Sequence, residues 1–231
     1  MTQSNKGLEV KVGYIELIAP HNGKKLTFIH PAKGPDTYFN VGEQIREDDL
    51  REPTFSENIS LVHASWQNPD NQYSKQVINL LRTNLFLGFT GILYAPKKGA
   101  YIQDHPKVAG NIIVLMDKRD LVKRLERKDK SVRFVPFGYK VGEQSASELA
   151  KNPFVIGLAG EEGAEKVAEI AANYSVMPNV WSFEGVNTEQ IRHSALLSPT
   201  ILNCRLYVDG NRYGYDRCGF AFGVRDVRAK N

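Results

Sequence analysis

Several stretches of this chain alternate hydrophobic and polar residues, a pattern that turns one face of a β-strand toward a core and the other toward solvent. Leu8 to Ala19 alternates in this way, and so does the run from Lys24 to His30. His21-Asn22-Gly23 stands between them and predicts that the two strands pair as a hairpin. Further strands are expected at residues 85–94, 100–103 and 132–139.

Other stretches repeat apolar residues with the period of a helix. Thr54 and Glu57 have the spacing of a capping box, in which each residue's side chain accepts a hydrogen bond from the other's backbone amide. This spacing predicts a helix from Phe55 to about Gln67. Further helices are expected from about Tyr73 to Thr83, over 117–128, from the capping pair Ser145 and Glu148 to before Pro153, and over 164–174.

The remaining segments carry weaker patterns. Residues 31–52 are rich in Gly, Pro and acidic residues and indicate a loop with a short strand at 38–41. The apolar run at 154–158 indicates a short strand, and 188–194 indicates a helical turn. Gly160-Glu161-Glu162-Gly163 is not expected to bind phosphate, because its two Glu residues would repel the anion.

The C-terminal stretch combines a fold signal with an unusual composition. Ile201 to Val208 predicts a strand, Asp209-Gly210-Asn211 a turn and Phe220 to Val227 a second strand, so a C-terminal hairpin is expected. Its buried side is expected to contain Leu202, Leu206, Phe222 and Val224. A run of Tyr, Arg, Asp and Cys between the strands is expected to be exposed on one surface, at Tyr213, Tyr215, Asp216, Arg217 and Cys218. Tyr and Arg dominate binding hot spots, so this run is the first candidate for a binding site.

Length and composition are those of an ordinary globular protein. The 231 residues are 42% hydrophobic and 24% charged, and no linker divides them, so a single domain spanning residues 1–231 is expected. Thirty Lys and Arg are mixed with 26 Asp and Glu for a net charge of +4, which argues against a nucleic-acid partner. The N-terminus lacks the apolar segment of a signal peptide, and no stretch is apolar enough to span a membrane. A cytoplasmic or virion location is the default expectation.

Residues capable of covalent or metal chemistry form no motif along the sequence. The five His residues are scattered without the spacing of a metal site, and no serine-hydrolase or Cys-x-x-Cys motif occurs. Cys204 and Cys218 are too few for a four-cysteine zinc site, and are either two separate thiols or a bridge across the expected hairpin. No catalytic residue, metal or cofactor is therefore predicted, and the protein is not expected to be an enzyme.

Three short pieces of the chain resemble one family. Arg51 to Glu57, Arg-Glu-Pro-Thr-Phe-Ser-Glu, resembles the R-L-P-T-x-x-E helix opening of the C-type-lectin-like domains related to formylglycine-generating enzymes, with Glu52 in place of the usual Leu. Gly219 to Arg228 resembles that family's closing strand, roughly G-F-x-V-R-x-V, and Trp181-Ser182 resembles the step before its late loops. The resemblance implies an α+β, C-type-lectin-like fold with an antiparallel sheet, two early helices and a C-terminal strand pair. Residues 68–180 would be a large insertion of unknown role.

The resemblance implies two functions. Formylglycine-generating enzymes use a close pair of late cysteines and an R-G-G-S-W segment, whereas this chain lacks that segment and has thirteen residues between Cys204 and Cys218. Variable proteins of diversity-generating retroelements instead carry varied residues in the C-terminal lectin-like region. Adenine-directed mutation of Asn codons there yields Asn, Asp, Tyr, Ser, Gly, Cys and Arg, and the segment from Asn203 to Phe220 has this composition.

The preferred hypothesis is a ligand-binding display protein with a hypervariable surface, whose ligand is an unknown protein or cell-surface structure. The expected contact residues are Asn203, Cys204, Tyr207, Asp209, Arg212, Tyr213, Tyr215, Asp216, Arg217, Cys218 and Phe220. Calcium-dependent sugar binding is not expected, because the stretch lacks a suitable cluster of oxygen ligands. The alternatives are an oxidase that uses Cys204 and Cys218, a viral structural protein, and a strand pair with ordinary surface residues.

Overall fold

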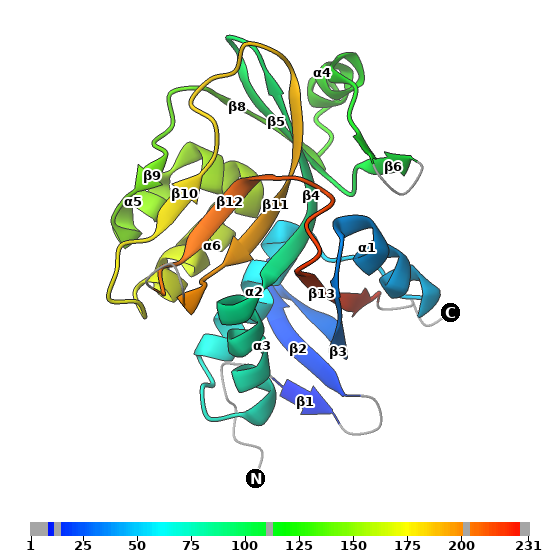
Figure 1. Cartoon of the computed structure of the whole chain (residues 1–231), viewed down its shortest axis with the longest axis vertical. Helices are drawn as coiled ribbons and strands as arrows, with labels where there is room; N and C mark the ends of the chain where they lie inside the picture. Colours follow the sequence, from blue (N-terminus) through cyan, green and yellow to red (C-terminus); the bar gives the residue numbers. More distant parts are fainter. Residues whose placement is uncertain (1–8, 12–14, 110–112, 201–203, 227–231) are drawn as a thin grey trace.

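One large sheet runs through the protein, with helices packed on its faces (Figure 1). The computed structural model describes residues 9–11, 15–109, 113–200 and 204–226. Within these ranges the strands of the large sheet are β1 (Glu9–Lys11), β2 (Glu16–His21), β3 (Lys24–Asp36), β4 (Leu85–Ala95), β5 (Gly99–Asp104), β8 (Val132–Pro136), β9 (Gly142–Glu143), β10 (Asn179–Trp181), β11 (Gln190–Leu197), β12 (Tyr207–Arg212) and β13 (Gly219–Arg225). The helices are α1 (Tyr38–Glu47), α2 (Phe55–Trp66), α3 (Gln72–Thr83), α4 (Lys118–Glu126), α5 (Ala146–Lys151) and α6 (Pro153–Ala171). Strands β6 (Lys107–Ala109) and β7 (Ile113–Leu115) form a separate hairpin.

Strand β4 is the centre of the sheet. The strand order is β1-β2-β3-β13-β4-β11-β12-β10-β9, and β5 joins the second half of β4 with β8 beyond it. All residues of β4 are buried, which explains its near-continuous apolar sequence. The sheet was expected to be antiparallel, but it is mixed. Strand β13 pairs with β4 in parallel, and β10 pairs with β12 in parallel. The cause is connectivity, since parallel neighbours arise where the chain crosses over and re-enters the sheet.

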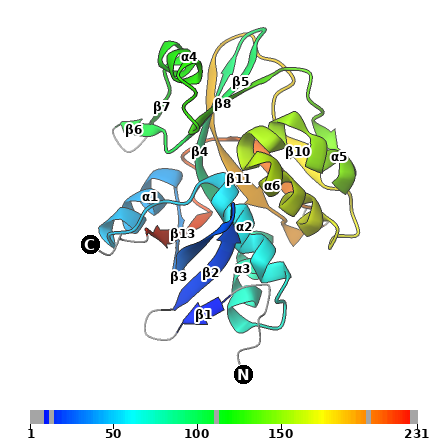
Figure 2. The same cartoon turned by 180° about the vertical axis from the view of Figure 1, so that it is seen from behind.

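The sheet separates two hydrophobic cores. The first core, formed with α2, α3 and α6, includes Phe28, Phe55, Ile59, Phe154 and Phe222. The second core, formed with α1 and α4, includes Tyr38, Val41, Ile45, Phe89 and Leu121. Successive side chains of β4 alternate between the two cores, as the geometry of a strand requires. Helices α5 and α6 lie behind β10 and β12 in Figure 1 and in front of them in Figure 2, and none of the described helices covers the opposite face of these two strands.

The strongest sequence predictions are confirmed. Strands β2 and β3 pair antiparallel across the predicted turn, where Asn22 and Gly23 have φ of 47° and 72°. Helix α2 has both hydrogen bonds of its capping box, from Glu57 N to Thr54 Oγ1 at 3.2 Å and from Thr54 N to Glu57 Oε2 at 2.7 Å. Helices α3, α4 and α5 and strands β4, β5 and β8 lie where their patterns predict them.

The predicted loop and strand at 31–52 are partly wrong, because residues 38–47 form helix α1. The Thr37 side chain accepts a hydrogen bond from Asn40 N and caps the helix. Tyr38, Val41 and Ile45 then fall on one buried face, at helical spacing. The Gly and acidic residues that suggested a loop occupy the rest of the helix or the segments beside it.

Two later predictions are also corrected. Residues 154–158 form the first turns of α6 rather than a strand, because the Asn152 side chain caps the helix by accepting from Phe154 N at 2.9 Å. The helix is buried, so its apolar run resembles a buried strand. Residues 188–194 enter β11 rather than a helical turn, because β11 is paired on both edges, by β4 and β12.

The expected C-terminal strand pair is wrong. Strand β12 pairs with β10 and β11, and β13 pairs with β3 and β4, so β4 and β11 lie between them. Asp209-Gly210-Asn211 lies inside β12. A Cβ atom on Gly210 would lie 2.4 Å from the Phe154 ring and 2.9 Å from the Tyr94 hydroxyl. Glycine is therefore required here by close packing and not by a turn. The predicted buried side holds at Leu206, Phe222 and Val224, while Leu202 lies outside the described residues.

Candidate functional site

The loop of residues 213–218 connects β12 to β13 and crosses β11 and β4 (Figure 1). Three hydrogen bonds to its carbonyl groups fix the backbone of this loop. They run from His193 Nε2 to Tyr213 at 2.8 Å, from Tyr38 N to Gly214 at 3.1 Å and from Leu85 N to Cys218 at 3.0 Å. The loop is therefore attached to β11, α1 and β4, and its conformation is set before any ligand arrives.

A first stack of side chains covers the open face of β10 and β12. It consists of Trp181, Tyr207 and Arg212. Neighbouring Val180 and Val208 point into the first core, so Trp181 and Tyr207 point to the opposite face, which is free of helices in the described ranges. The Arg212 guanidinium lies 5.1 Å from the centre of the Trp181 ring, and the rings of Trp181 and Tyr207 are 6.3 Å apart. Cation–π contacts of this length are attractive.

A second stack begins at the next residue. It consists of Arg192, Tyr213 and Tyr215. The Arg192 guanidinium lies 3.9 Å from the Tyr213 ring centre and donates to the Tyr213 hydroxyl at 2.6 Å. On the loop, the rings of Tyr213 and Tyr215 stack at 5.2 Å with an interplanar angle of 24°. The Arg192 side chain is buried and also donates to Asn211 Oδ1 at 3.0 Å, so the stack has a fixed base.

The aromatic rings of the two stacks are open to a partner. Trp181 is 44% exposed, Tyr213 44% and Tyr215 64%. Within the described ranges these are the Trp and Tyr side chains that count as exposed, and all three lie in the stacks. Large exposed rings with few rotatable bonds, held by arginine, are typical of interaction surfaces.

Asp209 corrects the predicted contact set, because it is 1% exposed. Its carboxylate accepts from Asn211 N at 2.8 Å and from Arg212 Nε. Burial raises the pKa of the Asp209 carboxyl above its usual range, and Arg212 opposes that shift. Asp209 thus holds the Arg212 guanidinium in place against the Trp181 ring. Because its own side chain is buried, Asp209 cannot contact a ligand. The physical reason is that Asp209 lies beside Trp181 in the register of β10 and β12 and is ion-paired to Arg212, so the first stack covers its carboxylate.

His193 supports the loop from inside the sheet. A carbonyl oxygen only accepts, so the 2.8 Å contact with Tyr213 places a proton on His193 Nε2. The imidazole lies 4.5 Å from the ring of Tyr38 and is 1% exposed. Burial lowers the pKa of His193 to about 4, so the ring is neutral at physiological pH.

The two cysteines are separate thiols, as one of the two sequence interpretations held. Both are exposed: Cys204 precedes β12, and Cys218 ends the loop before β13. Partial burial and the nearby Asp216 carboxylate raise the pKa of the Cys218 thiol. A raised pKa reduces the fraction of thiolate, which is the reactive form.

The predicted contact residues fall into four groups. Exposed side chains are those of Cys204, Tyr213, Tyr215, Arg217 and Cys218; half-buried ones are Tyr207, Arg212, Asp216 and Phe220; Asp209 is buried; and Asn203 lies outside the described residues. Phe220 lies on β13, where its ring contacts Gly34 of the neighbouring strand β3. The predicted contact set missed Trp181, Arg192 and His193. The signal for residues 192 and 193 was the alternation of Ile191, His193 and Ala195, which is typical of a strand.

The arrangement of these groups is suited to contact with another molecule. The described part of the chain contains no group of three His, Cys, Asp or Glu side chains that could hold a metal ion. Among the helices in the same ranges, none has the length and apolar character to cross a membrane. Comparisons of the chain with protein-family models, with curated proteins and with solved structures found no match.

Proposed function

We propose that this protein is a ligand-binding display protein, resembling the variable proteins of diversity-generating retroelements. It holds a protein or cell-surface ligand through the two stacks and the loop 213–218, by contact rather than covalent chemistry. The proposal rests on the exposure of Trp181, Tyr213 and Tyr215 above a fixed backbone. Rings that are already ordered lose little entropy on binding, so most of their contact energy contributes to affinity.

Positions that hold the fold alternate with positions where a side chain can change. Leu206, Val208 and Phe222 are fully buried in the first core and fix β12 and β13. Tyr215 and Arg217 lie exposed on the loop between those strands. A new side chain at an exposed position displaces no core atom, so its cost in stability is small. A protein selected for many ligands needs this division.

Two of the three sequence pieces that resemble the C-type-lectin-like family, 51–57 and 219–228, are in contact, which supports that fold as part of the proposal. Arg51 and Val224 exchange backbone hydrogen bonds of 2.9 and 2.7 Å. The Arg51 guanidinium also donates to both Glu57 carboxylate oxygens at 2.8 Å and to Asp226 at 3.0 Å. The Arg and Glu of the first motif thus attach the start of α2 to the closing strand, and Glu57 caps α2 as well.

The alternative function is an oxidase that uses Cys204 and Cys218. Such chemistry needs a thiolate, whereas burial and Asp216 raise the pKa of the Cys218 thiol. The two cysteines also flank different strands, β12 and β13, between which β4 and β11 are inserted. Both observations favour the binding function. Oxidation of a Cys-containing peptide by the protein, abolished in Cys218→Ser, would reverse this preference.

A genomic comparison tests the proposal most directly. We expect a near-copy of the codons for residues 195–225 beside the gene, differing at adenines, next to a reverse-transcriptase gene. Sequencing of this gene from many cells of one population should then show changes at exposed positions such as 213, 215 and 217. Changes should be absent at buried positions 206, 208 and 210. Absence of the near-copy and of the reverse transcriptase would overturn the retroelement proposal.

A stability measurement tests the division between fold and surface without knowledge of the ligand. Tyr215→Ala and Arg217→Ala should each change the free energy of unfolding by less than about 0.5 kcal/mol, since both side chains are exposed. The matched change Leu206→Ala, in the same segment but fully buried, should cost about 2–5 kcal/mol. If the loop variants were as destabilised as Leu206→Ala, the loop would be structural and could not be a variable surface.

A further inference from the structure

A pocket of about 320 Å³ lies between α1, β4 and the segment that leads into β6. It is lined by Tyr38, Phe39, Gly42, Arg46, Glu52, Phe89, His105, Pro106 and Val108. None of these residues belongs to the two stacks or to the predicted contact set, so the pocket is a separate site. Its volume falls in the range that holds small organic ligands.

Three aromatic rings form one side of the pocket. Tyr38 and Phe89 lie 4.6 Å apart, and Tyr38 and Phe39 meet edge to face at 5.5 Å. Tyr38 is 1% exposed and lines the pocket. This wall therefore suits an apolar group.

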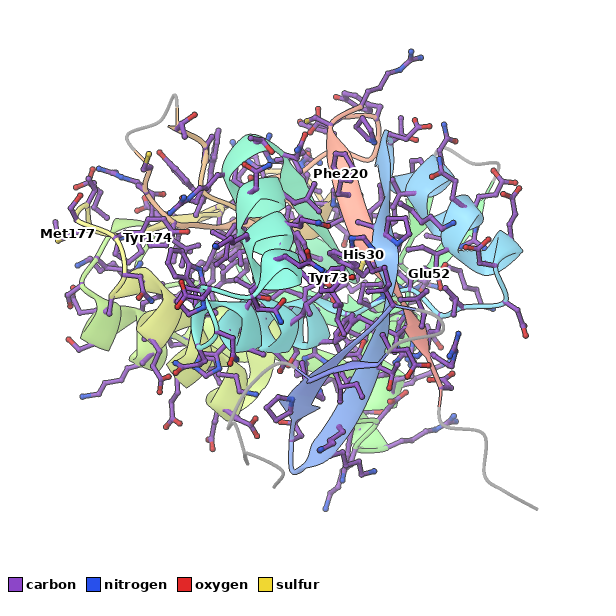
Figure 3. All side chains as sticks on the ribbon, turned by 90° about the horizontal axis from the view of Figure 1, so that it is seen from below. His30, Glu52, Tyr73, Tyr174, Met177 and Phe220 are labelled. Carbon is purple, nitrogen blue, oxygen red and sulfur yellow. The ribbon has the colours of Figure 1, made fainter. Side chains whose placement is uncertain are left out.

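An ion pair forms the opposite, polar part of the lining. Arg46 Nη1 donates to Glu52 Oε1, and Figure 3 shows Glu52 at the side of α1. The Glu52 side chain is 16% exposed, and its Oε2 accepts no hydrogen bond from the described chain. Arg46 is 52% exposed, so its guanidinium keeps donors for another partner. Arg51 does not neutralise Glu52, because its guanidinium is engaged by Glu57 and Asp226.

Gly42 makes room for this pair on helix α1. A Cβ atom at Gly42 would lie 2.9 Å from Phe89 Cε1 and 3.2 Å from Arg46 Nη1. The glycine has an ordinary helical conformation, so it is not required by backbone geometry. It lets the ion pair and the Phe89 ring reach the helix backbone, and so brings the charged and aromatic parts of the lining together.

We propose that this pocket binds a free α-amino acid with an apolar side chain. A carboxylate beside a guanidinium matches the ammonium and carboxylate that an α-amino acid carries on one carbon atom. Glu52 holds the ammonium and Arg46 the carboxylate, each through charge-assisted hydrogen bonds. The apolar side chain packs among the three rings, whose faces also attract the ammonium.

Calorimetric titration of the whole protein with L-leucine and L-phenylalanine tests the proposal. We expect saturable binding of at least one of them. Two analogues of leucine remove one charge each: 4-methylpentanoic acid lacks the ammonium, and 3-methylbutylamine lacks the carboxylate. Each should bind at least about tenfold more weakly, because one charged hydrogen-bonded contact is lost. This comparison uses only the wild-type chain and needs no variant to fold.

Variants locate the binding. Glu52→Gln should weaken leucine binding at least about tenfold, whereas the control Glu47→Gln, at an exposed residue at the end of α1, should leave it unchanged. Circular dichroism establishes that each variant is folded. The proposal is overturned if neither amino acid binds, if the amine or the acid binds as tightly as leucine, or if a folded Glu52→Gln binds leucine like the wild type.

Discussion

Gly210 is required by the atoms around it rather than by its own backbone. A Cβ atom there would overlap the Phe154 ring at 2.4 Å and approach the Tyr94 hydroxyl, which itself donates to the Gly210 carbonyl at 2.8 Å. Gly210→Ala is therefore expected to lower the free energy of unfolding by about 1–3 kcal/mol through overpacking. Urea unfolding followed by circular dichroism measures the loss.

The control for this change is Gly185→Ala. No atom lies within 4 Å of a Cβ built on Gly185, and its φ is outside the left-handed region. It should unfold within about 0.5 kcal/mol of the wild type. Equal stability of Gly210→Ala and Gly185→Ala would show that the packing of Phe154 against β12 is wrong.

His193 makes stability depend on pH through its bond to the loop. The pKa of His193 is about 4 in the folded protein, because the ring is buried, and about 6.5 in an unfolded chain. The unfolded state therefore binds the proton first, and stability is lost as pH falls from about 6.5 to about 4. At about 1.4 kcal/mol per pKa unit, the full loss is about 3–4 kcal/mol.

His193→Gln tests this dependence because Gln keeps an N–H donor for the Tyr213 carbonyl but does not titrate. Its free energy of unfolding should fall less than that of the wild type between pH values of about 7 and about 4.5. Some dependence will remain, since burial also lowers the pKa of His21, a ring hydrogen-bonded to Ser60. Identical pH profiles for variant and wild type would exclude His193 as the cause.

At the scale of elements, helix α6 contains a break that its sequence does not predict. Gly160 has φ of 75° and ψ of 171°, and the helix continues on both sides of it. Such angles are essentially restricted to glycine, so Gly160→Ala should cost about 1–3 kcal/mol. Nothing lies within 4 Å of a Cβ at this position, so the cost comes from the backbone alone. Thermal or urea unfolding checks it.

Glu161→Ala is the matched control for Gly160→Ala. Glu161 is exposed and adjacent in sequence, and Ala is a good helix former. Its stability should stay within about 0.5 kcal/mol of the wild type. If Gly160→Ala left the free energy of unfolding unchanged, residue 160 would have ordinary helical angles and α6 would be unbroken.

Elements with a local cause were predictable from the sequence, and elements set by distant partners were not. The capping box of Thr54 and Glu57 defines α2 within a few residues, and it forms as expected. Strand β11 could not be separated from a helical turn, because its strand character comes from pairing with β4 and β12. The turn predicted at Asp209-Gly210-Asn211 was wrong for the same reason. Gly210 is required by the close approach of the Phe154 ring, which is far away in the sequence.

The candidate site divides in the same way. The excess of Tyr and Arg after β12 pointed to exposed rings, and Tyr213 and Tyr215 are exposed. Sequence alone could not place Trp181 beside Arg212, because that contact depends on the parallel pairing of β10 with β12. Asp209 was predicted on the surface because alternation identifies the face of a residue, but not whether neighbouring side chains on that face, here Arg212 and Trp181, cover it.

At the scale of the whole molecule, β4 joins what could otherwise be separate units. Its side chains Phe86, Ile92 and Tyr94 enter the first core, while Leu87, Phe89 and Leu93 enter the second. Unfolding of either core would expose half of β4 to water and so remove a wall of the other. We therefore expect the 231 residues to unfold in one cooperative transition, with the same urea midpoint for every probe.

The two tryptophans allow this expectation to be measured from opposite parts of the chain. Trp66 packs against the first core, near Tyr174, whereas Trp181 lies on the open face beyond β12. Trp181→Phe leaves the fluorescence of Trp66 as the signal, and Trp66→Phe leaves that of Trp181. In each variant the fluorescence midpoint should equal the midpoint by circular dichroism, because loss of β4 disrupts both regions together. The contrary result would be a Trp181 signal that changes at a lower urea concentration than circular dichroism in the same variant. The region around β10 and β12 would then unfold on its own, and the two stacks would belong to a separable unit rather than depend on β4.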